Sequence, residues 1–428
     1  MLATLRSIWA LLLGIGLIMT ASGLQSSLLG VRAGSEGFAT EVTGLIMSGY
    51  FAGFLAGSVI VPRLMQQVGH IRVFAALASL FSTAVLVHAV VVEPATWFLM
   101  RLLTGFCSAG IFIVAESWMN DRSSNESRGQ VMALYMMVVM GSMAIGQFGL
   151  GLADPQGFLL FIYASVLISL ALIPLLLTAS PAPDFSTPKR LGLWQLYRLS
   201  PLGFVACFGV GLLQSMLWGL SSVYASLAGF SIGQIALYGG AIFVGGLVCQ
   251  WPIGRISDRY DRRSILTGVL LTVAILAAPA GLFAPLNFVS ELWAIGLIGG
   301  LAMTSYSVAI AYVNDWLDPE QMVAASASLY FVYGVGASIG PFAASAVMAE
   351  VGPPGYYLSL ATVAGVTVAF ALFRMTRRTA APIEEQGPSV ALPPPASPVM
   401  TELAAEMLQE QAEEDAGFPE DEEEKSAN

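Results

Sequence analysis

The sequence predicts an all-α polytopic membrane protein in which twelve transmembrane helices form two pseudo-symmetric six-helix halves. Three observations support this fold class. Of the 428 residues, 56% are apolar and only 11% are charged, whereas a soluble domain has about 25% charged residues. Twelve apolar runs are long enough to cross a bilayer, and segments of the first half recur in the second. This composition excludes a soluble enzyme, a nucleic-acid-binding protein and a disordered chain.

Short polar or Gly/Pro-rich turns separate the apolar runs and so define the spans. We expect the spans near residues 7–30, 39–62, 72–92, 96–119, 128–151, 157–178, 201–226, 234–254, 264–284, 290–313, 323–348 and 355–375. The first run follows Arg6 and could also be read as a signal peptide. Its removal would leave eleven spans and break the symmetry, so we expect it to remain.

Basic residues lie almost entirely on one side of these spans. Fifteen fall in segments expected on one side, and Arg32 alone falls on the other. Because positive charge marks the cytoplasmic side of membrane proteins, both termini and the central loop are expected in the cytoplasm. The chain is therefore predicted to be a multi-pass protein of the bacterial inner membrane.

Composition also divides the chain into four parts. We expect a six-helix half at 1–178, a cytoplasmic linker at 179–200, a second six-helix half at 201–378 and a disordered tail at 379–428. Thirteen of the 28 acidic residues follow Thr379, where Lys425 is the single base. The tail thus accounts for the net charge of −10, and it could bind a cytoplasmic partner.

The repeat consists of three matched pairs at an offset of 194 or 195 residues. Asn120-Asp121 corresponds to Asn314-Asp315, Leu134-Tyr135 to Leu329-Tyr330, and Ile145-Gly146-x-Phe148 to Ile339-Gly340-x-Phe342. An asparagine-aspartate pair at the end of a span is not explained by hydrophobicity alone. Matching segments half a chain apart are typical of a transporter built from two parallel halves.

The loop after the eighth span carries the most specific motif. Its sequence, GRISDRYDRR from Gly254 to Arg263, resembles the G-x-x-x-D-R-x-G-R-R signature of the major facilitator superfamily, with Asp261 at the second glycine. The first-half copy is degraded, since Pro62, Gln66 and Gln67 replace its glycine, acid and base. In the fourth span, RLLTGFCSAG is similar to the family pattern R-x-x-x-G. The amino-acid sequences of the first and fourth spans look most like those of the YcaD-like bacterial permeases.

This resemblance covers residues 7–378 and implies a secondary transporter. In that family two six-helix halves rock about a site near the middle of the membrane. Efflux and uptake stay equally open, because Gln147 replaces the proline of the antiporter-associated motif in GSMAIGQFGLG. The alternative is a non-transporting receptor or scaffold that signals through the acidic tail.

Two ionisable residues of the fourth span are candidates for the substrate or proton pathway. Burying a charge inside a membrane costs free energy, so Arg101 and Glu116 are expected to have a structural or functional role. Arg101 either snorkels to the outer surface or, as the family pattern implies, lines the central cavity. Glu116 either pairs with basic cytoplasmic loops or, being partly desolvated, carries a proton.

Polar and aromatic residues of the cavity-lining spans are further candidates. They are Gln25, Gln147, Gln214, Trp218 and Tyr306. Buried glutamines often form hydrogen bonds between helices instead of touching a substrate. If they do contact one, their chemistry suits a small organic solute that is uncharged or weakly anionic.

Charged residues at the cytoplasmic span ends are the candidate gating groups. The family fold implies that Asp258 faces the start of the fifth span near Arg128, where a helix N-terminus favours a carboxylate. Arg259 and Arg262 would then reach Asp315. Asp121 is the first-half counterpart of Asp315. This charged clasp would hold the cytoplasmic side shut, unless the loop is simply a basic topology anchor.

No pattern in the sequence indicates an enzyme. It contains neither a metal-binding H-E-x-x-H motif nor a phosphate-binding G-x-x-x-x-G-K-[ST] loop. Cys107, Cys207 and Cys249 are isolated in apolar runs, so no disulfide or metal cluster is expected. We therefore expect no cofactor, and we expect transport to draw on protons.

Overall fold

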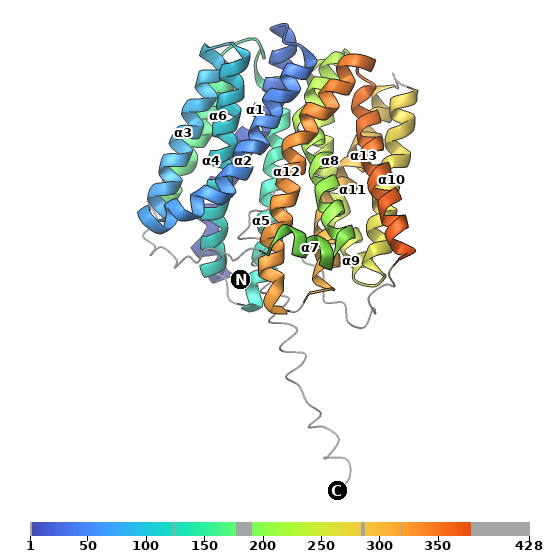
Figure 1. Ribbon diagram of the computed structural model, residues 1–428. Coiled ribbons are helices and arrows are strands. Elements are labelled where there is room, and N and C mark those ends of the chain that lie inside the picture. Colours follow the sequence, from blue (N-terminus) through green and yellow to red (C-terminus); the bar gives the residue numbers. More distant parts are fainter. Residues whose placement is uncertain (1, 123–124, 177–190, 284–286, 318, 378–428) are drawn as a thin grey trace, which may run out of the picture.

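The two halves lie side by side as bundles of long helices whose axes are roughly aligned (Figure 1). The computed structural model describes residues 2–122, 125–176, 191–283, 287–317 and 319–377. Every regular element in this part of the chain is a helix. The first half contains α1 (Leu2–Ser35), α2 (Thr40–Val68), α3 (His70–Val90), α4 (Pro94–Arg122), α5 (Asn125–Phe148), the short 3₁₀ helix η1 (Gly149–Leu152) and α6 (Leu159–Leu176).

The second half repeats this arrangement after the linker. It contains α8 (Pro201–Leu227), α9 (Ile232–Ser257), α10 (Arg262–Leu282), α11 (Phe288–Asn314), α12 (Pro319–Val351) and α13 (Gly355–Met375). Between the halves, α7 (Leu193–Leu199) lies at the end of the bundle where α8 begins (Figure 1). We call this end the α7 side and the opposite end the far side.

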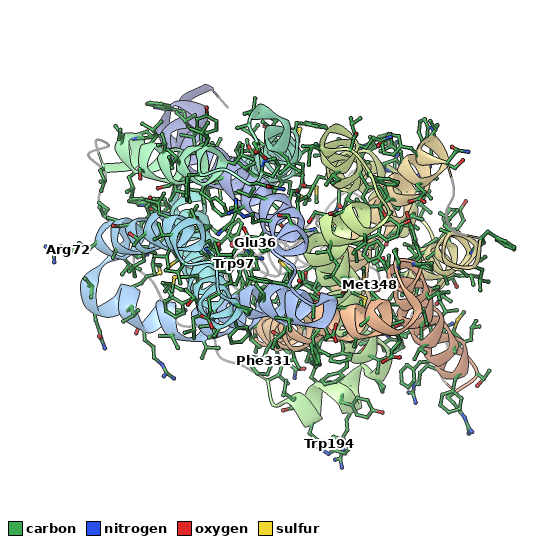
Figure 2. The ribbon with its side chains drawn as sticks, turned by 90° about the horizontal axis from the view of Figure 1, so that it is seen from above. Glu36, Arg72, Trp97, Trp194, Phe331 and Met348 are labelled. Carbon is green, nitrogen blue, oxygen red and sulfur yellow. The ribbon has the colours of Figure 1, made fainter. Side chains whose placement is uncertain are left out.

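The helices have the length and composition of membrane spans. Within the described residues, eleven helices qualify, and α6 adds a shorter apolar stretch, Leu159–Pro174. Large apolar side chains cover the perimeter, as the view from above shows (Figure 2), and Leu152 and Trp293 are each 72% exposed. Apolar exposure of this kind suits lipid rather than water. The predicted twelve-helix architecture is confirmed.

Local sequence signals set the helix ends. Ser231 precedes α9 and forms a capping box with Gln234, in which each side chain accepts a hydrogen bond from the other residue's backbone N–H. Asn287 caps α11 by accepting from a backbone N–H at 2.9 Å. Gly37 and Gly229 have φ values of 75° and 80° in the turns after α1 and α8. Glycine adopts this left-handed conformation without steric cost.

The same helix pairs pack together in both halves. In the first half α2 packs on α4, and α1 packs on α5 and α6; in the second, α9 packs on α11, and α8 packs on α12 and α13. A Cβ atom on Gly146 of α5 would lie 2.2 Å from the Thr20 carbonyl oxygen of α1. A Cβ atom on Gly340 of α12 would lie 2.6 Å from the Leu212 carbonyl oxygen of α8. The repeated Ile-Gly motif therefore reflects equivalent close helix packing.

The halves meet tightly on the far side. Their contacts run through α2 with α12, α1 with α8, and α5 with α9. A Cβ atom on Gly44 would lie 1.8 Å from Ser345 Oγ of α12, and one on Gly30 would lie 2.1 Å from Ser222 Oγ of α8. Only glycine permits such an approach, so the far side of the interface is closed.

On the α7 side, α5 and α9 separate. They still touch where Gly246 meets Met140, because a Cβ atom on Gly246 would lie 3.3 Å from the Met140 sulfur. From this level toward the α7 side, a groove of about 530 Å³ opens between α5, α9 and α11. The structure is therefore closed on the far side and partly open on the α7 side.

The described end of the linker is attached to the second half. The Leu191 N–H donates to the Ala324 carbonyl at 3.2 Å, and the Leu191 carbonyl accepts from Ser328 Oγ at 2.8 Å. Helix α7 itself was not expected from the sequence. Most of the predicted linker and all of the predicted tail, at 177–190 and 378–428, lie outside the described residues.

Candidate functional site

A small cavity of about 20 Å³ lies between the two halves. Three predicted residues, Gln25, Arg101 and Trp218, converge on it from α1, α4 and α8. Each lies seven to ten residues from the far-side end of its helix, which corresponds to roughly 10–15 Å at the rise of an α-helix. The complete lining is Ser22, Gln25, Ser26, Tyr50, Phe51, Arg101, Met143, Trp218 and Gly219.

Arg101 is held in this cavity and does not snorkel, because it is only 4% exposed. Close packing of α2 on α4 positions it: a Cβ atom on Gly105 would lie 1.8 Å from the Tyr50 carbonyl oxygen. The guanidinium carbon lies 4.5 Å from the centre of the Tyr50 ring, which is a cation–π contact. Among the described residues, no acidic side chain pairs with Arg101. The cavity therefore carries an uncompensated buried positive charge.

The other polar atoms of the cavity are also available. Ser22 Oγ, Gln25 Nε2 and Trp218 Nε1, together with Arg101 Nε, have no hydrogen-bond partner among the described protein atoms. Gln25 is 1% exposed and Ser22 is 8% exposed. Unpaired buried polar groups are uncommon in native proteins because each has lost its water. Their convergence makes this cavity the candidate binding site.

Two other predicted glutamines are engaged between helices and do not line this cavity. Gln214 donates to the Ala302 carbonyl at 2.9 Å and accepts from the Tyr333 hydroxyl at 2.8 Å. Gln147 accepts a hydrogen bond from Ser27 of α1. It also faces Gly239 of α9, where an added Cβ atom would lie 2.3 Å from its amide oxygen. Both residues join helices and restrict where the cavity lies.

Glu116 lies closer to the α7 side, at the other end of α4 from Arg101. Its carboxylate is fully buried and accepts a hydrogen bond from the Tyr135 hydroxyl at 2.8 Å. Tyr306 and Tyr330 also lie near enough to interact with it electrostatically. The predicted Tyr306 is 1% exposed, and its ring centre is 4.8 Å from that of Tyr333. Glu116 is thus a buried acid among tyrosines from both halves.

The groove on the α7 side is apolar with a polar rim. Its walls include Met136 and Met140 of α5 and Leu247 of α9, while Arg255 and Asp258 line it as well. The Arg255 guanidinium carbon lies 5.3 Å from the centre of the Trp251 ring. Only one helical turn of α5, about 4.5 Å, separates Met140 in the groove from Met143 in the small cavity.

Three of the predicted gating residues, Asp258, Arg262 and Asp315, form a charged cluster where α9, α10 and α11 meet, whereas Asp121 lies in the first half and the predicted contact of Arg259 with Asp315 is not formed. Arg262 is 1% exposed and makes an ion pair with Asp315, and it lies 3.5 Å from Asp258. Arg259 is exposed and lacks an ion pair with any described residue. Asp258 also lines the groove opposite Ala133 of α5. The side chain of Arg128 lies outside the described residues.

Burial of the Asp315 carboxylate raises its pKa to about 7. The positive charge of Arg262 opposes this shift, whereas the negative charges of Asp258 and Asp261 add to it. The first half has an analogous pair, since Asp121 interacts electrostatically with His70 at the start of α3. A histidine thus stands where the second half has Arg262.

Several site residues were missed by sequence reasoning. Tyr50, Ser22 and Met143 line the cavity, but nothing in their helical spacing distinguishes them from packing residues. Glu291 is another buried ionisable group; it is 1% exposed and accepts from the Tyr224 hydroxyl at 2.6 Å. Its place near the start of the tenth predicted span made it resemble a loop residue.

The chain is similar in sequence to one protein family and to several of its members. The model of the Major Facilitator Superfamily matches residues 11–295 and 203–408. An uncharacterised MFS-type transporter of Yersinia enterocolitica is 27% identical over 361 residues, covering 84% of this chain and 93% of that protein. The uncharacterised MFS-type transporter YcaD of Escherichia fergusonii is 25% identical over 380 residues, covering 88% and 98%. The predicted resemblance to YcaD-like permeases is confirmed.

Solved structures share the fold at low sequence identity. The nucleoside transporter NupG has a TM-score of 0.73 at 13% identity, covering 86% of this chain and 98% of its own. A D-xylose-proton symporter has a TM-score of 0.65 at 12% identity, covering 85% and 97%. The family model, which covers both six-helix halves, shows that the chain belongs to the major facilitator superfamily, and its curated relatives are MFS-type transporters; the chain is therefore a secondary transporter, not an enzyme.

Proposed function

We propose that this transporter moves a small organic solute across the bacterial inner membrane by alternating access, in symport or antiport with protons. The observation that carries the proposal is the cavity between the halves, where buried Arg101, Gln25 and Trp218 have polar atoms without partners. A solute bound there would contact both halves at once. Rocking of the halves would then expose it to one side of the membrane at a time.

The two sides of the interface support this cycle. Glycine contacts such as Gly44 with Ser345 close the far side, while the groove beside Met140 opens on the α7 side. The bias of basic residues favours a cytoplasmic location for the α7 side. The structure therefore represents an inward-facing or nearly occluded state, in which a solute reaches the cavity through the groove.

Glu116 is the proposed proton carrier. It lies in α4, the helix that also carries Arg101, and it accepts a hydrogen bond from Tyr135 of α5. The desolvation cost of a buried carboxylate falls when it takes up a proton. Its protonation state can therefore bias the interactions of Glu116 with Tyr135 of α5 and Tyr330 of α12, and with them the equilibrium between the two faces.

Counterflow in proteoliposomes tests this proposal. Vesicles loaded with an unlabelled solute should transiently accumulate the labelled solute, and an artificial pH gradient should drive its net accumulation. Glu116→Gln should keep counterflow and lose pH-driven accumulation. Glu291→Gln is the matched control, because it removes another buried carboxyl that is hydrogen-bonded to a tyrosine, but one at the far-side start of α11 whose partner, Tyr224 of α8, also belongs to the second half.

Two results would contradict the proposal. Full pH-driven accumulation by Glu116→Gln would exclude Glu116 as the proton carrier. Absence of counterflow for every solute that binds the purified protein would favour a receptor or scaffold over a transporter.

A further inference from the structure

We infer that the substrate is an amphipathic organic monoanion, with its charged head at Arg101 and its apolar body directed toward the methionine-lined groove. This inference rests on the proposed transport function and names the class of solute that the cavity selects. It follows from three properties of the described side chains: charge, hydrogen-bonding sense and wall composition.

Charge comes first. Arg101 is 4% exposed and has no acidic partner among the described residues. The Tyr50 ring, 4.5 Å from the guanidinium carbon, compensates only part of the desolvation of a buried cation. A bound anion would supply the missing counter-charge through charge-assisted hydrogen bonds. A cationic solute would be repelled, and a neutral solute would leave the charge uncompensated. Because Arg101 is the one basic residue in the lining of this cavity, a single negative charge completes the site.

The hydrogen-bonding sense agrees with this charge. Trp218 offers only a donor, because the indole nitrogen cannot accept. Its Nε1 and the amide Nε2 of Gln25 are both without partners, as is the hydroxyl of Ser22. An ionised carboxylate or sulfonate only accepts hydrogen bonds. The donors that line the cavity match such a head.

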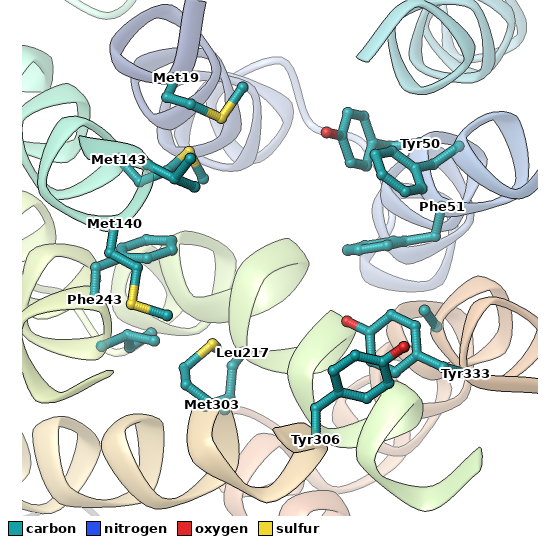
Figure 3. Close-up of a cluster of buried hydrophobic side chains, with 14 of the residues drawn as sticks. Met19, Tyr50, Phe51, Met140, Met143, Leu217, Phe243, Met303, Tyr306 and Tyr333 are labelled. Atoms are coloured by element: carbon teal, nitrogen blue, oxygen red, sulfur yellow. The ribbon is translucent and has the colours of Figure 1, made fainter. Parts of the chain in front are cut away.

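The walls define the rest of the molecule. The cavity itself, at about 20 Å³, is too small for an organic solute, so binding must move the side chains that close it. These are flexible methionines: Met143 lines the cavity, and Met140 closes the inner end of the groove. Figure 3 shows Met140 and Met143 of α5 on one side of this buried cluster and Tyr50, Tyr306 and Tyr333 on the other. Methionine adapts readily to apolar surfaces of variable shape.

The groove leads from this cluster to a cationic rim. Arg255 lies over Trp251 at the rim and has no acidic partner in the described part of the chain. Asp258 lines the same groove, but Arg262 lies 3.5 Å from it and offsets its charge. The volume of about 530 Å³ lies within the range of sites for small organic ligands, about 300–1,000 Å³. An anion with an apolar body can therefore enter the groove, interact first with Arg255 at the rim and then bind Arg101 in the cavity.

Equilibrium binding to the purified full-length protein in lipid nanodiscs tests the inference. The probes are phenylbutyrate, phenylbutanesulfonate, the neutral amide phenylbutyramide and the cation phenylbutylamine. Their effects on melting temperature and tryptophan fluorescence give their affinities. Both anions should bind at least about tenfold more tightly than the amide, because charge-assisted hydrogen bonds replace neutral ones. The amine should not bind. The amide also corrects for partition of the shared apolar body into lipid.

Variants locate the effect. Arg101→Gln should abolish the preference for anions over the amide, and Arg101→Lys should restore part of it. Trp218→Phe keeps every charge and should weaken binding of both anions by removing one donor. This variant stays informative if Arg101→Gln fails to fold.

Equal affinity for the anions and the amide, or an unchanged preference in Arg101→Gln, would overturn the inference. The result is separable from transport, because binding at equilibrium requires no flux. Anion binding without counterflow would leave the substrate class intact and refute the transport proposal. Counterflow of a neutral or cationic solute would support the transport proposal and refute the proposed substrate class.

Discussion

Adding one methyl group at Gly44 should force the far side of the transporter open. A Cβ atom there would lie 1.8 Å from Ser345 Oγ, 2.3 Å from Ser345 Cβ and 2.7 Å from the Pro341 carbonyl oxygen. A change of the Ser345 rotamer cannot relieve the last two contacts, so α2 and α12 must move apart by about 1 Å to reach ordinary contact distances. The strain exists only while the far side is closed.

The size of the effect follows from the cost of overpacking. Inserting a methyl group into a well-packed contact costs about 1–3 kcal/mol. At about 1.4 kcal/mol per factor of ten, Gly44→Ala should shift the population toward the state that is open on the far side by about 5- to 150-fold. Gly141→Ala is the control, because it is also helical and its Cβ atom would meet nothing within 4 Å.

Spin labels at Glu41 and Glu350 can measure this shift. These residues are exposed at the far-side ends of α2 and α12, on opposite halves. In a background without Cys107, Cys207 and Cys249, Gly44→Ala should lengthen the distance between the labels, and Gly141→Ala should not. An unchanged distance distribution in Gly44→Ala would refute the assignment of these contacts as the far-side closure.

Three further outcomes are expected. The folded state raises the pKa of Asp315 to about 7, while an unfolded Asp titrates near about 4. Between these values the folded state binds the extra proton, so stability should rise as pH falls through 7. From pH 8 to 6 the gain is about 1.4 kcal/mol, and the melting temperature of Asp315→Asn should lack this component; an equal pH slope in that variant would contradict the assignment. Asp258→Asn keeps every positive charge of the loop, so spin-label distances between α5 and α9 should shift toward the state open on the α7 side if Asp258 belongs to a clasp, and stay the same if the loop is only a topology anchor. Truncation after Arg378 should leave flux intact, since the proline and glutamate of the acidic tail disfavour packing on the body; reduced flux at equal membrane abundance would show otherwise.

The architecture was readable from the sequence because hydrophobic length and internal repetition depend on local composition. The Ile-Gly repeat, for example, marks Gly146 and Gly340, which make equivalent helix contacts in the two halves. Arg101 was also identifiable, since a charge in a membrane span requires a local reason.

The direction of each polar side chain was not readable. Gln25, Gln147 and Gln214 look alike in the sequence, yet Gln25 lines the cavity while the other two join helices. Which face of a helix meets the interface depends on its rotation against neighbours from both halves. The groove was invisible for the same reason, because it arises from the spacing between α5 and α9, more than a hundred residues apart.

The most direct test of the account is counterflow of phenylbutanesulfonate in proteoliposomes. This probe stays ionised at neutral pH, so it does not cross the lipid by itself in a protonated form. Vesicles with the native protein, loaded with unlabelled sulfonate, should transiently accumulate the labelled compound, and vesicles with Arg101→Gln should not. Absence of accumulation by the native protein at concentrations that saturate binding would contradict transport of an organic anion through the Arg101 cavity.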